Sequence, residues 1–315
     1  MNIAILAGGL SHERDVSVRS GRRVAESLRD LNIPCTVSDV DGKLLGQWEI
    51  EPPTVVIPLL HGTNGEDGSL RDVLESLGLS YVGSRPDACR IAFDKPIAKA
   101  VAQAAGIKTP TAVALPHSTF RELGADAVIK AVANKVGLPA IVKPTKSGSS
   151  LGATVVRDIR ELPAALVAAF AYGDVALVEQ FIVGTEVAVS VVERNGAIDA
   201  LPAVEIVPDG GFYDYAARYT AGTTEFFAPA RLSEAVAEKC ARIAVDAHTA
   251  LGLRDLSRSD LIVDANGEVW FLEVNVAPGM TETSLFPLAV EAAGLTLGEV
   301  MRALVETAAR RTVTS

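Results

Sequence analysis

The sequence has little cysteine and fewer basic than acidic side chains. Its 3 cysteines, Cys35, Cys89 and Cys240, form no motif, so we expect reduced thiols in the core rather than disulfides. Lys and Arg number 29 against 39 Asp and Glu, a formal net charge of −10. Nucleic acid is therefore not expected as a partner, because there is no basic excess to neutralise its phosphates. A small anion held by a few local Lys and Arg stays open.

Long apolar runs and the common nucleotide fingerprints are also missing. No stretch approaches the roughly 18 consecutive apolar residues of a membrane span. Residues 2–6 form a short apolar run with no basic segment before it, which predicts a first β-strand rather than a signal peptide. We expect a cytoplasmic protein with no membrane partner. The absence of G-x-G-x-x-G counts against a nicotinamide-dependent dehydrogenase, and the P-loop is absent too.

The composition is that of a globular protein, with 49% hydrophobic and 22% charged residues. Strands and helices alternate over residues 1–85, which predicts a parallel sheet with helices on its faces. Ligands of such sheets bind beyond the carboxyl ends of the strands, where we expect loops 8–15 and 61–68. Residues 86–175 and 176–315 are expected to form a second and a third block.

The hydrophobic periodicity predicts the individual elements. Helices are expected over residues 16–31, 69–77, 96–105, 125–136, 161–171, 234–251, 286–293 and 297–310. Strands are expected over residues 2–6, 35–40, 54–60, 81–82, 111–115, 140–143, 152–156, 177–181, 187–193 and 203–207, together with a hairpin near residue 266.

The hairpin carries the strongest chemical signal. Asn266-Gly267 predicts a two-residue type I′ loop, and counting back from it places Asp260 opposite Glu273. Asn275 then shares their face. Two opposed carboxylates among apolar residues repel each other unless a cation lies between them. Three hard oxygen ligands suit Mg²⁺, so we prefer a metal site to the alternative of a solvent-facing acidic hairpin.

A glycine- and serine-rich turn, residues 145–152, joins two predicted strands. Its backbone N–H groups could wrap phosphate oxygens, with Lys143 at the end of the preceding strand. Alone it would be an ordinary hairpin tip, but beside a metal site it becomes a candidate grip for nucleotide phosphates. Lys95 could meet other phosphates. Glu179 and Glu186 could read adenine and ribose, although Glu179 could equally be one exposed acid on an edge strand.

Further candidates lie in loops. Glu13, His61 and Glu66 occur at the expected ligand end of the first sheet, where a carboxylate could bind an ammonium group. The alternative for His12 and Glu13 is capping of a helix N-terminus. The aromatic segment 212–219 could be a lid over a reacting centre, or a packed surface loop.

Together these pieces resemble the D-alanine–D-alanine ligases of the ATP-grasp superfamily. The resemblance covers nearly the whole chain and keeps the motif order. The matching motifs are Gly9-Leu-Ser-His-Glu13-Arg-Asp-Val-Ser17, His61-Gly-Thr-Asn-Gly-Glu-Asp-Gly68, Tyr81-Val-Gly-Ser84, Asp94-Lys95, Ile141-Val-Lys-Pro144 with Gly148-Ser-Ser150, Phe212-Tyr-Asp-Tyr215, and Leu272-Glu-Val-Asn275 with Pro278-Gly-Met-Thr281.

The resemblance implies a three-domain ATP-grasp fold of the α/β class, α+β in its C-terminal part. Residues 1–85 would be a Rossmann-like substrate-binding domain, 86–175 the central subdomain, and 176–315 the C-terminal subdomain with the metal site. The implied reaction joins two D-alanines through an acylphosphate, releasing ADP and phosphate, for peptidoglycan precursors. It implies ATP, two Mg²⁺ or Mn²⁺ ions and a homodimer.

The resemblance also implies residue roles. ATP would be held by Lys95, Lys143, Ser149, Ser150, Glu179, Ile182 and Glu186. The metal would be held by Asp260, Glu273 and Asn275. Arg258 and the Gly279 N–H would stabilise the oxyanion. Glu13, Ser149 and Tyr219 would form a hydrogen-bonded set. The substrates would contact Glu13, His61, Arg218, Tyr219 and Ser284.

Six residues in four places depart from the usual pattern of these ligases. The lid has Arg218 in place of the usual Lys, a change that adds bulk and a fixed fork. Val276-Ala277, Lys146-Ser147 and Gln180 also differ from the usual residues. Two alternatives stay open, of which Arg218 and Val276-Ala277 motivate the first, while the complete set of metal and phosphate residues counts against the second. One is a related ligase with another acceptor, namely D-serine, D-lactate or a secondary-metabolite amino acid. The other is a nucleotide-binding protein without catalysis.

Overall fold

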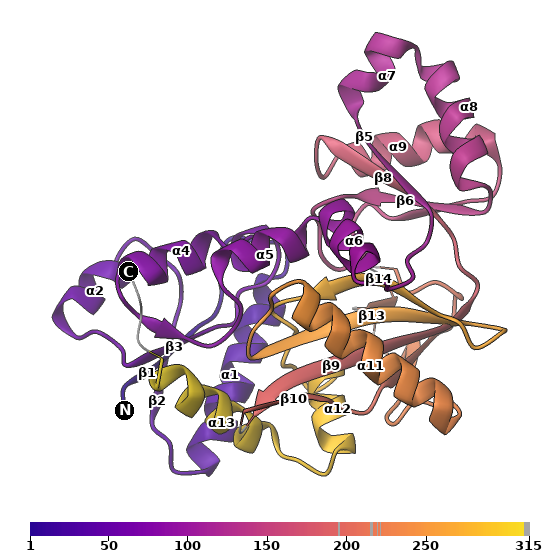
Figure 1. The fold of residues 1–315 in the computed structure, drawn as a ribbon. Coiled ribbons are helices and arrows are strands. Elements are labelled where there is room, and N and C mark those ends of the chain that lie inside the picture. The colour runs from indigo at the N-terminus through magenta and orange to yellow at the C-terminus, as the bar shows by residue number, and fades with distance from the viewer. Residues whose placement is uncertain (195, 215–216, 219, 221, 312–315) are drawn as a thin grey trace.

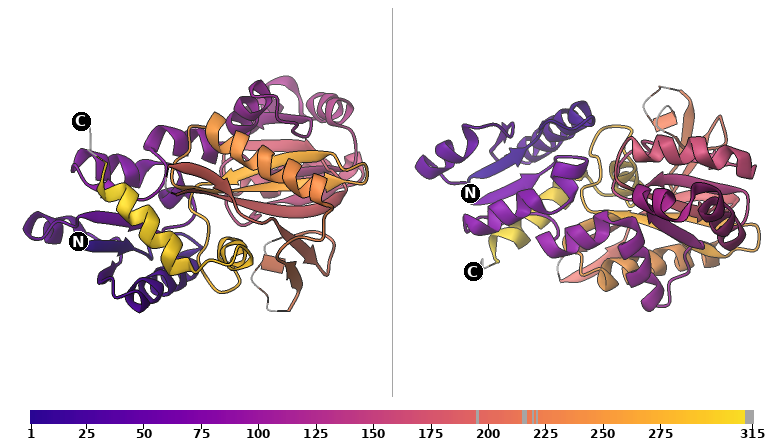
Figure 2. Two further views of the ribbon diagram at one scale, coloured as in Figure 1. Left: turned by 60° about the horizontal axis from the view of Figure 1, so that its bottom comes forward. Right: turned by 90° about the horizontal axis from the view of Figure 1, so that it is seen from above.

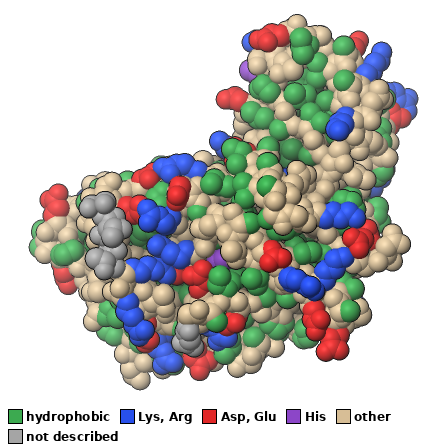
Figure 3. All heavy atoms as spheres, in the orientation of Figure 1, with side chains coloured by type: hydrophobic (Ala, Val, Ile, Leu, Met, Phe, Trp, Pro, Cys, Tyr) green, Lys and Arg blue, Asp and Glu red, His purple; other side chains and the backbone are tan. Residues whose placement is uncertain are grey.

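The computed structural model describes residues 1–194, 196–214, 217–218, 220 and 222–311. Within them the strands form three sheets, called here the N-terminal, central and C-terminal sheets (Figure 1). The part with the central sheet projects from the rest, and acidic and basic side chains are interspersed on the face shown in Figure 3. No helix in these ranges has the length and apolar character that crossing a membrane requires.

The N-terminal sheet is parallel throughout, as the alternation of strands and helices predicts, with the order β2-β1-β3-β4. Apolar side chains of β1 and β3 are buried on both faces. Helix α13 arrives from the far end of the chain and packs on α1 beside this sheet (Figures 1 and 2). The elements are β1 Ile3–Leu6, α1 Arg14–Asp30, β2 Cys35–Ser38, α2 Leu44–Ile50, β3 Val55–Pro58, α3 Thr63–Glu66, α4 Ser69–Ser76 and β4 Ser80–Tyr81.

The central sheet is antiparallel, with the order β5-β8-β6-β7. Its helices bury an apolar core of their own with the sheet. Strand β8 is an interior strand, so the alternative that Glu179 is an exposed acid on an edge strand was wrong. The elements are β5 Ala112–Pro116, α7 His117–Leu123, α8 Ala125–Val136, β6 Ala140–Pro144, β7 Thr154–Val156, the 3-10 helix Ile159–Glu161, α9 Leu162–Phe170 and β8 Val175–Gln180.

The C-terminal sheet has the order β12-β11-β9-β13-β14, with β10 paired to β9. Helices α5, α6 and α11 bury one face and α12 and α13 the other. Its elements and covering helices are α5 Pro86–Phe93, α6 Lys95–Ala104, β9 Gly184–Arg194, β10 Ala197–Ala200, β11 Val204–Pro208, β12 Thr224–Phe227, α11 Glu234–Ala250, β13 Leu256–Asp264, β14 Val269–Asn275, α12 Leu285–Ala292 and α13 Leu297–Ala309.

The hairpin of β13 and β14 differs from its predicted turn. Asp264 and Glu268 are joined by a backbone hydrogen bond, so the loop holds three residues, and only Gly267 among them has positive φ (76°). This is the usual three-residue loop, a tight turn followed by a left-handed glycine, and the predicted type I′ turn was wrong. A register shift after Asp260 then adds one residue on β14, and the two differences cancel. Asp260 lies opposite Glu273, as predicted.

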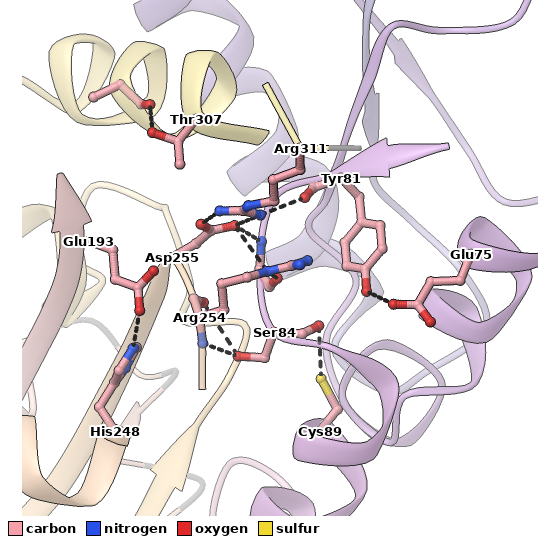
Figure 4. A network of polar contacts seen from close by, with 12 residues as sticks. Glu75, Tyr81, Ser84, Cys89, Glu193, His248, Arg254, Asp255, Thr307 and Arg311 are labelled. Carbon is pink, nitrogen blue, oxygen red and sulfur yellow. Dashed lines mark hydrogen bonds and ion pairs between the residues drawn. The ribbon is translucent and has the colours of Figure 1, made fainter. Parts of the chain in front are cut away.

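A buried polar network ties the N-terminal sheet to the C-terminal sheet (Figure 4). Asp255, fully buried at the start of β13, accepts a hydrogen bond from the N–H of Gly83 (2.6 Å) and pairs with Arg311. Arg254 donates to the Gly83 carbonyl (2.9 Å) and lies over the ring of Tyr81. These contacts hold the segment after β4 against β13. They thereby fix the orientation of the N-terminal sheet relative to the C-terminal sheet.

The predicted helices and strands all have counterparts that begin and end within three residues of the expected limits. The described elements that the sequence did not predict are short: α2, α3, α5, α7, the 3-10 helix, β10 and β12. The predicted boundary after residue 175 falls at the start of β8, whose neighbours are β5 and β6 of the central sheet.

Candidate active site

Two cavities adjoin where the three sheets meet. The first, of about 400 Å³, lies between the central and C-terminal sheets. The second, of about 410 Å³, reaches from the same place to the loops of the N-terminal sheet. Each predicted site residue that the structure describes lines one or both; Tyr219 lies outside the described residues. The first is lined by Lys95, Lys143, Ser150, Glu179, Ile182, Glu186, Arg218, Asp260 and Glu273. The second is lined by Glu13, His61, Lys95, Ser149, Arg218, Arg258, Glu273, Asn275, Gly279 and Ser284.

The predicted metal residues share one face of the hairpin. Asp260 is opposite Glu273 and Arg258 is opposite Asn275. Both carboxylates have cations beside them, because Arg258 pairs with Asp260 in a two-pronged contact (2.7 and 2.9 Å) and Lys95 Nζ lies 3.3 Å from Glu273. The described residues include no cluster of three His, Cys, Asp or Glu suited to a metal, and this set has two carboxylates and one amide.

The chemistry of that donor set fits a divalent cation of the hard class. Two carboxylates and an amide oxygen leave positions for phosphate and water oxygens, as Mg²⁺ prefers. Burial opposes the charge of Glu273, but Lys95 and Lys143 outweigh it and hold the pKa of this carboxyl at about 2. Glu273 is therefore ionised at neutral pH and available as a ligand.

Lysines from two elements face the first cavity. Lys143, near the end of β6, lies 2.9 Å from Glu179 Oε2, and Lys95, at the start of α6, donates to the Ser147 carbonyl (2.6 Å). Glu179 is fully buried, and its other oxygen pairs with Lys99. The carboxylate of Glu179 lies at the cavity wall and is held by two lysines, Lys143 at the wall and Lys99 behind it.

The 145–152 turn contacts a loop of the N-terminal sheet through Ser149 and the described part of segment 212–219 through Ser150. Ser149 and Ser150 have left-handed backbone angles (φ 51° and 57°). Ser149 Oγ donates to Glu13, which supplies two members of the predicted Glu13–Ser149–Tyr219 set. Ser150 Oγ donates to the Tyr213 carbonyl (3.0 Å) and accepts from Arg218 Nε (3.2 Å). The guanidinium of Arg218 lies 4.1 Å from the centre of the Tyr213 ring.

His61 is held in one tautomer. Its Nδ1 is 3.0 Å from the Ala277 carbonyl, which can only accept, so Nδ1 carries the hydrogen. Its Nε2 faces the Ser20 hydroxyl at 3.4 Å, and Ser20 Oγ accepts from the N–H of Met280 (3.0 Å). Burial lowers the pKa of His61, so the ring is neutral at pH 7.

Two carboxyls of the site, the buried Glu66 and the partly buried Glu186, have pKa values raised far above their usual range. Burial, together with the nearby charge of Glu13, raises the pKa of Glu66 to about 8. Glu66 accepts from the N–H of Gly62 (2.9 Å), which closes its loop. Burial also raises the pKa of Glu186 to about 7. The second cavity therefore has one neutral acid, Glu66, close to Glu13 at neutral pH.

The loop that follows β14 reaches into the second cavity. A Cβ at Gly279 would lie 2.8 Å from Ser284 Oγ, so no larger residue fits without a shift. Ser284 stands before α12 but does not cap it; its Oγ instead accepts from the N–H of Thr281 (3.0 Å). Arg258 is buried beside this loop. Burial alone would lower its pKa, but Asp260 keeps that pKa above its ordinary value, so Arg258 is always charged.

Sequence reasoning missed two residues that support the site. Ser20 links α1 to His61 and to the 279–280 turn, although its sequence context is an ordinary helix. Lys99 lies one helical turn after Lys95, a spacing that places both on one side of α6. This spacing could have identified Lys99 as a site residue from the sequence.

The first cavity lies between the central sheet, which is antiparallel and covered by helices, and the C-terminal sheet. Lysines and a pair of opposed carboxylates line it. This fold and site define an enzyme of the ATP-grasp class. The comparisons with known proteins narrow the class. A family model described as "D-ala D-ala ligase C-terminus" matches residues 101–306. The chain therefore belongs to the D-alanine–D-alanine ligase family.

Relatives and solved structures agree over nearly the full length. The chain is 38% identical to the D-alanine–D-alanine ligase of Bordetella petrii over 98% of this chain and 92% of that one. It is 39% identical to that of Anaeromyxobacter dehalogenans, covering 98% and 96%. The D-alanine–D-alanine ligase of Bacillus anthracis superposes with a TM-score of 0.82 at 30% identity, covering 98% of each chain. The VanG D-Ala:D-Ser ligase of Enterococcus faecalis superposes at 0.84 with 28% identity, covering 98% and 99%.

Proposed function

We propose that this protein joins two D-alanine molecules into D-alanyl-D-alanine with ATP, releasing ADP and phosphate, to supply peptidoglycan precursors. The observation that carries the proposal is that the two cavities share Lys95 and Glu273 in their walls. One cavity presents phosphate-binding and metal-binding groups, and the other presents groups for a small zwitterion. A phosphoryl group can therefore pass between nucleotide and amino acid at the shared wall.

The first half of the reaction forms an acylphosphate. A carboxylate oxygen of the first D-alanine attacks the γ-phosphorus, and the bond from that phosphorus to the ADP oxygen breaks. Lys95 and Lys143 hold the phosphates, and the N–H groups of the 145–152 turn surround them. Glu179, Ile182 and Glu186 contact the adenosine part. Glu13 holds the ammonium group of the first D-alanine, with His61 beside it.

The second half forms the peptide bond. The amine of the second D-alanine loses a proton and attacks the acyl carbon, and phosphate leaves from the tetrahedral intermediate. Arg258 and the Gly279 N–H face the oxygen on which negative charge develops, and such preorganised charge is commonly the largest catalytic contribution. Ser284 binds the second carboxylate, and Arg218 contacts the same substrate.

Asp260, Glu273 and Asn275 would hold divalent cations, and we propose two ions of Mg²⁺ or Mn²⁺. When bound, such ions neutralise phosphate charge and orient the phosphates. We also propose a cytoplasmic homodimer, since two-fold dimers are the commonest oligomers. Three domains are proposed around the three sheets, with the limit between the central and C-terminal parts moved from residue 175 to the end of β8.

Phosphate release with product identification by mass tests the proposal. Wild-type protein with ATP, Mg²⁺ and D-alanine should release phosphate and form D-alanyl-D-alanine, and L-alanine should give neither. Glu273→Gln should abolish turnover. Glu268→Gln is the matched control, because Glu268 lies on the same hairpin but is half-exposed and pairs with Lys108 and Lys239.

A different acceptor is the second candidate, favoured by Arg218 at the lid and by the similarity to a D-Ala:D-Ser ligase. Parallel reactions with D-alanine plus D-serine or D-lactate separate the two. Turnover only with a mixed pair would replace the D-alanine acceptor. Binding of ATP without phosphate release under any amino acid would instead support a nucleotide-binding protein without catalysis.

A further inference from the structure

Lys99 is a buried cation that stands behind the first cavity. It lies on α6, which Figure 1 shows at the junction of the central sheet and β14. Its side chain is 5% exposed and lines neither cavity. Its Nζ pairs with Glu179 Oε1 and lies 3.4 Å from the Phe271 carbonyl. Lys99 can therefore reach a bound ligand only through another side chain.

Glu179 is that side chain. It is 1% exposed, its second oxygen lies 2.9 Å from Lys143 Nζ, and it links three elements: α6, β8 and β6. Lys143 stands at the cavity wall, so the row Lys99–Glu179–Lys143 runs from the interior to the ligand space. Charges so deeply buried interact strongly, because little water screens them.

The charges in this row do not cancel. Lys143 and Glu179 alone would form a neutral pair, and Lys143 would offer a phosphate little net attraction. Burial lowers the pKa of Lys99, and the charge of Glu179 opposes that shift. With a protonated Lys99 on the other carboxylate oxygen, the row carries one net positive charge. We propose that Lys99 is a positioning residue for the nucleotide: it neutralises and orients Glu179 from behind, so that the charge of Lys143 is directed to the phosphates of ATP. This inference rests on the proposed function of the site as an ATP site.

A purely structural role predicts something different. Buried ion pairs can often be replaced by apolar residues of similar size with no loss of stability. If Lys99 only packs α6 against β14, its loss should affect all ligands alike. If it supplies charge, its loss should weaken phosphate binding far more than binding of the uncharged adenosine, which senses only the altered orientation of Glu179.

Calorimetric dissociation constants at fixed Mg²⁺ test this distinction, with ATP, adenosine and inorganic tripolyphosphate as probes. Lys99→Met should weaken ATP and tripolyphosphate binding about tenfold to fiftyfold, as expected for one unit charge several ångströms away at an effective dielectric constant of about 20. Adenosine binding should weaken much less than tripolyphosphate binding, because adenosine carries no charge. Lys99→Arg, which keeps the charge, should remain close to wild type.

A charge rescue keeps the test decisive even if Lys99→Met is less stable. In the double variant Lys99→Met with Glu179→Gln, both buried charges are gone and Lys143 again carries one net positive charge. Tripolyphosphate binding, which needs no base contact, should recover toward wild type. Wild-type ATP affinity in Lys99→Met, equal losses for all three probes, or no recovery in the double variant would overturn the proposal. Wild-type protein that binds ATP but makes no dipeptide would overturn the proposed reaction and leave the role of Lys99 standing.

Discussion

The pair of Arg258 and Asp260 allows stability and activity to be separated by mutation. Both side chains are buried, at 10% and 7% exposure, and both nitrogens of the contact lie within 2.9 Å of a carboxylate oxygen. Removing one partner of such a pair leaves the other charge buried and alone, which costs about 3–5 kcal/mol. We expect this loss in Asp260→Asn and in Arg258→Met.

The expected shift in melting temperature follows from the chain length. An unfolding entropy of about 2.1 cal/mol/K per residue over 315 residues gives about 0.7 kcal/mol for each degree. Each single variant should therefore melt about 4–7 °C lower than the wild type. The double variant carries no buried charge at this pair and should recover most of that loss.

The melting temperatures of the wild type, the two single variants and the double variant are measured by thermal unfolding without ligands. Urea unfolding of the same four proteins gives the coupling energy between Arg258 and Asp260. Turnover should be lost in all three variants and should not recover in the double variant, since none of them keeps both the carboxylate that we propose for the metal and the cation that we propose for the oxyanion. A coupling energy below about 1 kcal/mol would refute the buried-pair reasoning, because that is the value of an exposed pair.

Three other predictions test separate parts of the structure. Ser149→Ala removes the hydrogen bond to the Glu13 carboxylate, and kcat/KM for D-alanine should fall about tenfold to a hundredfold; unchanged kinetics would contradict the role of this bond. The pKa of Glu66 is raised from 4.5 to about 8. The folded state thus keeps a proton that the unfolded state has lost, and the free energy of unfolding should fall as pH rises through this window, by at most about 1.4 kcal/mol per pH unit. Urea unfolding at pH 6 and 8 should show a smaller decline in the free energy of unfolding for Glu66→Gln than for wild type. Equal declines would show that Glu66 does not cause the pH dependence. Asp255→Asn should lower the free energy of unfolding by about 1–3 kcal/mol because it breaks the pair with Arg311, which is partly exposed; a change within experimental error would contradict the bridging role of the Figure 4 network.

The hairpin shows how a local rule can be wrong while its consequence holds. Alternation in a strand places side chains on one face by a strict period of two, so an error of one residue in the loop would have separated Asp260 from Glu273. The register shift after Asp260 restores the opposition. Loop length depends on φ at single residues, and here Asn266 is not left-handed, which a two-residue turn would require.

The sequence by itself determined most of the helices and strands, the parallel first sheet and the groups that line the site. These depend on apolar periodicity and on motifs within a few residues of one another. Only the tertiary structure decided that β8 is an interior strand, that Asp260 pairs with Arg258, and that Lys99 stands behind Glu179. Contacts of this kind join residues far apart in the chain or depend on burial, and burial sets both the charge and the partners of an ionisable side chain.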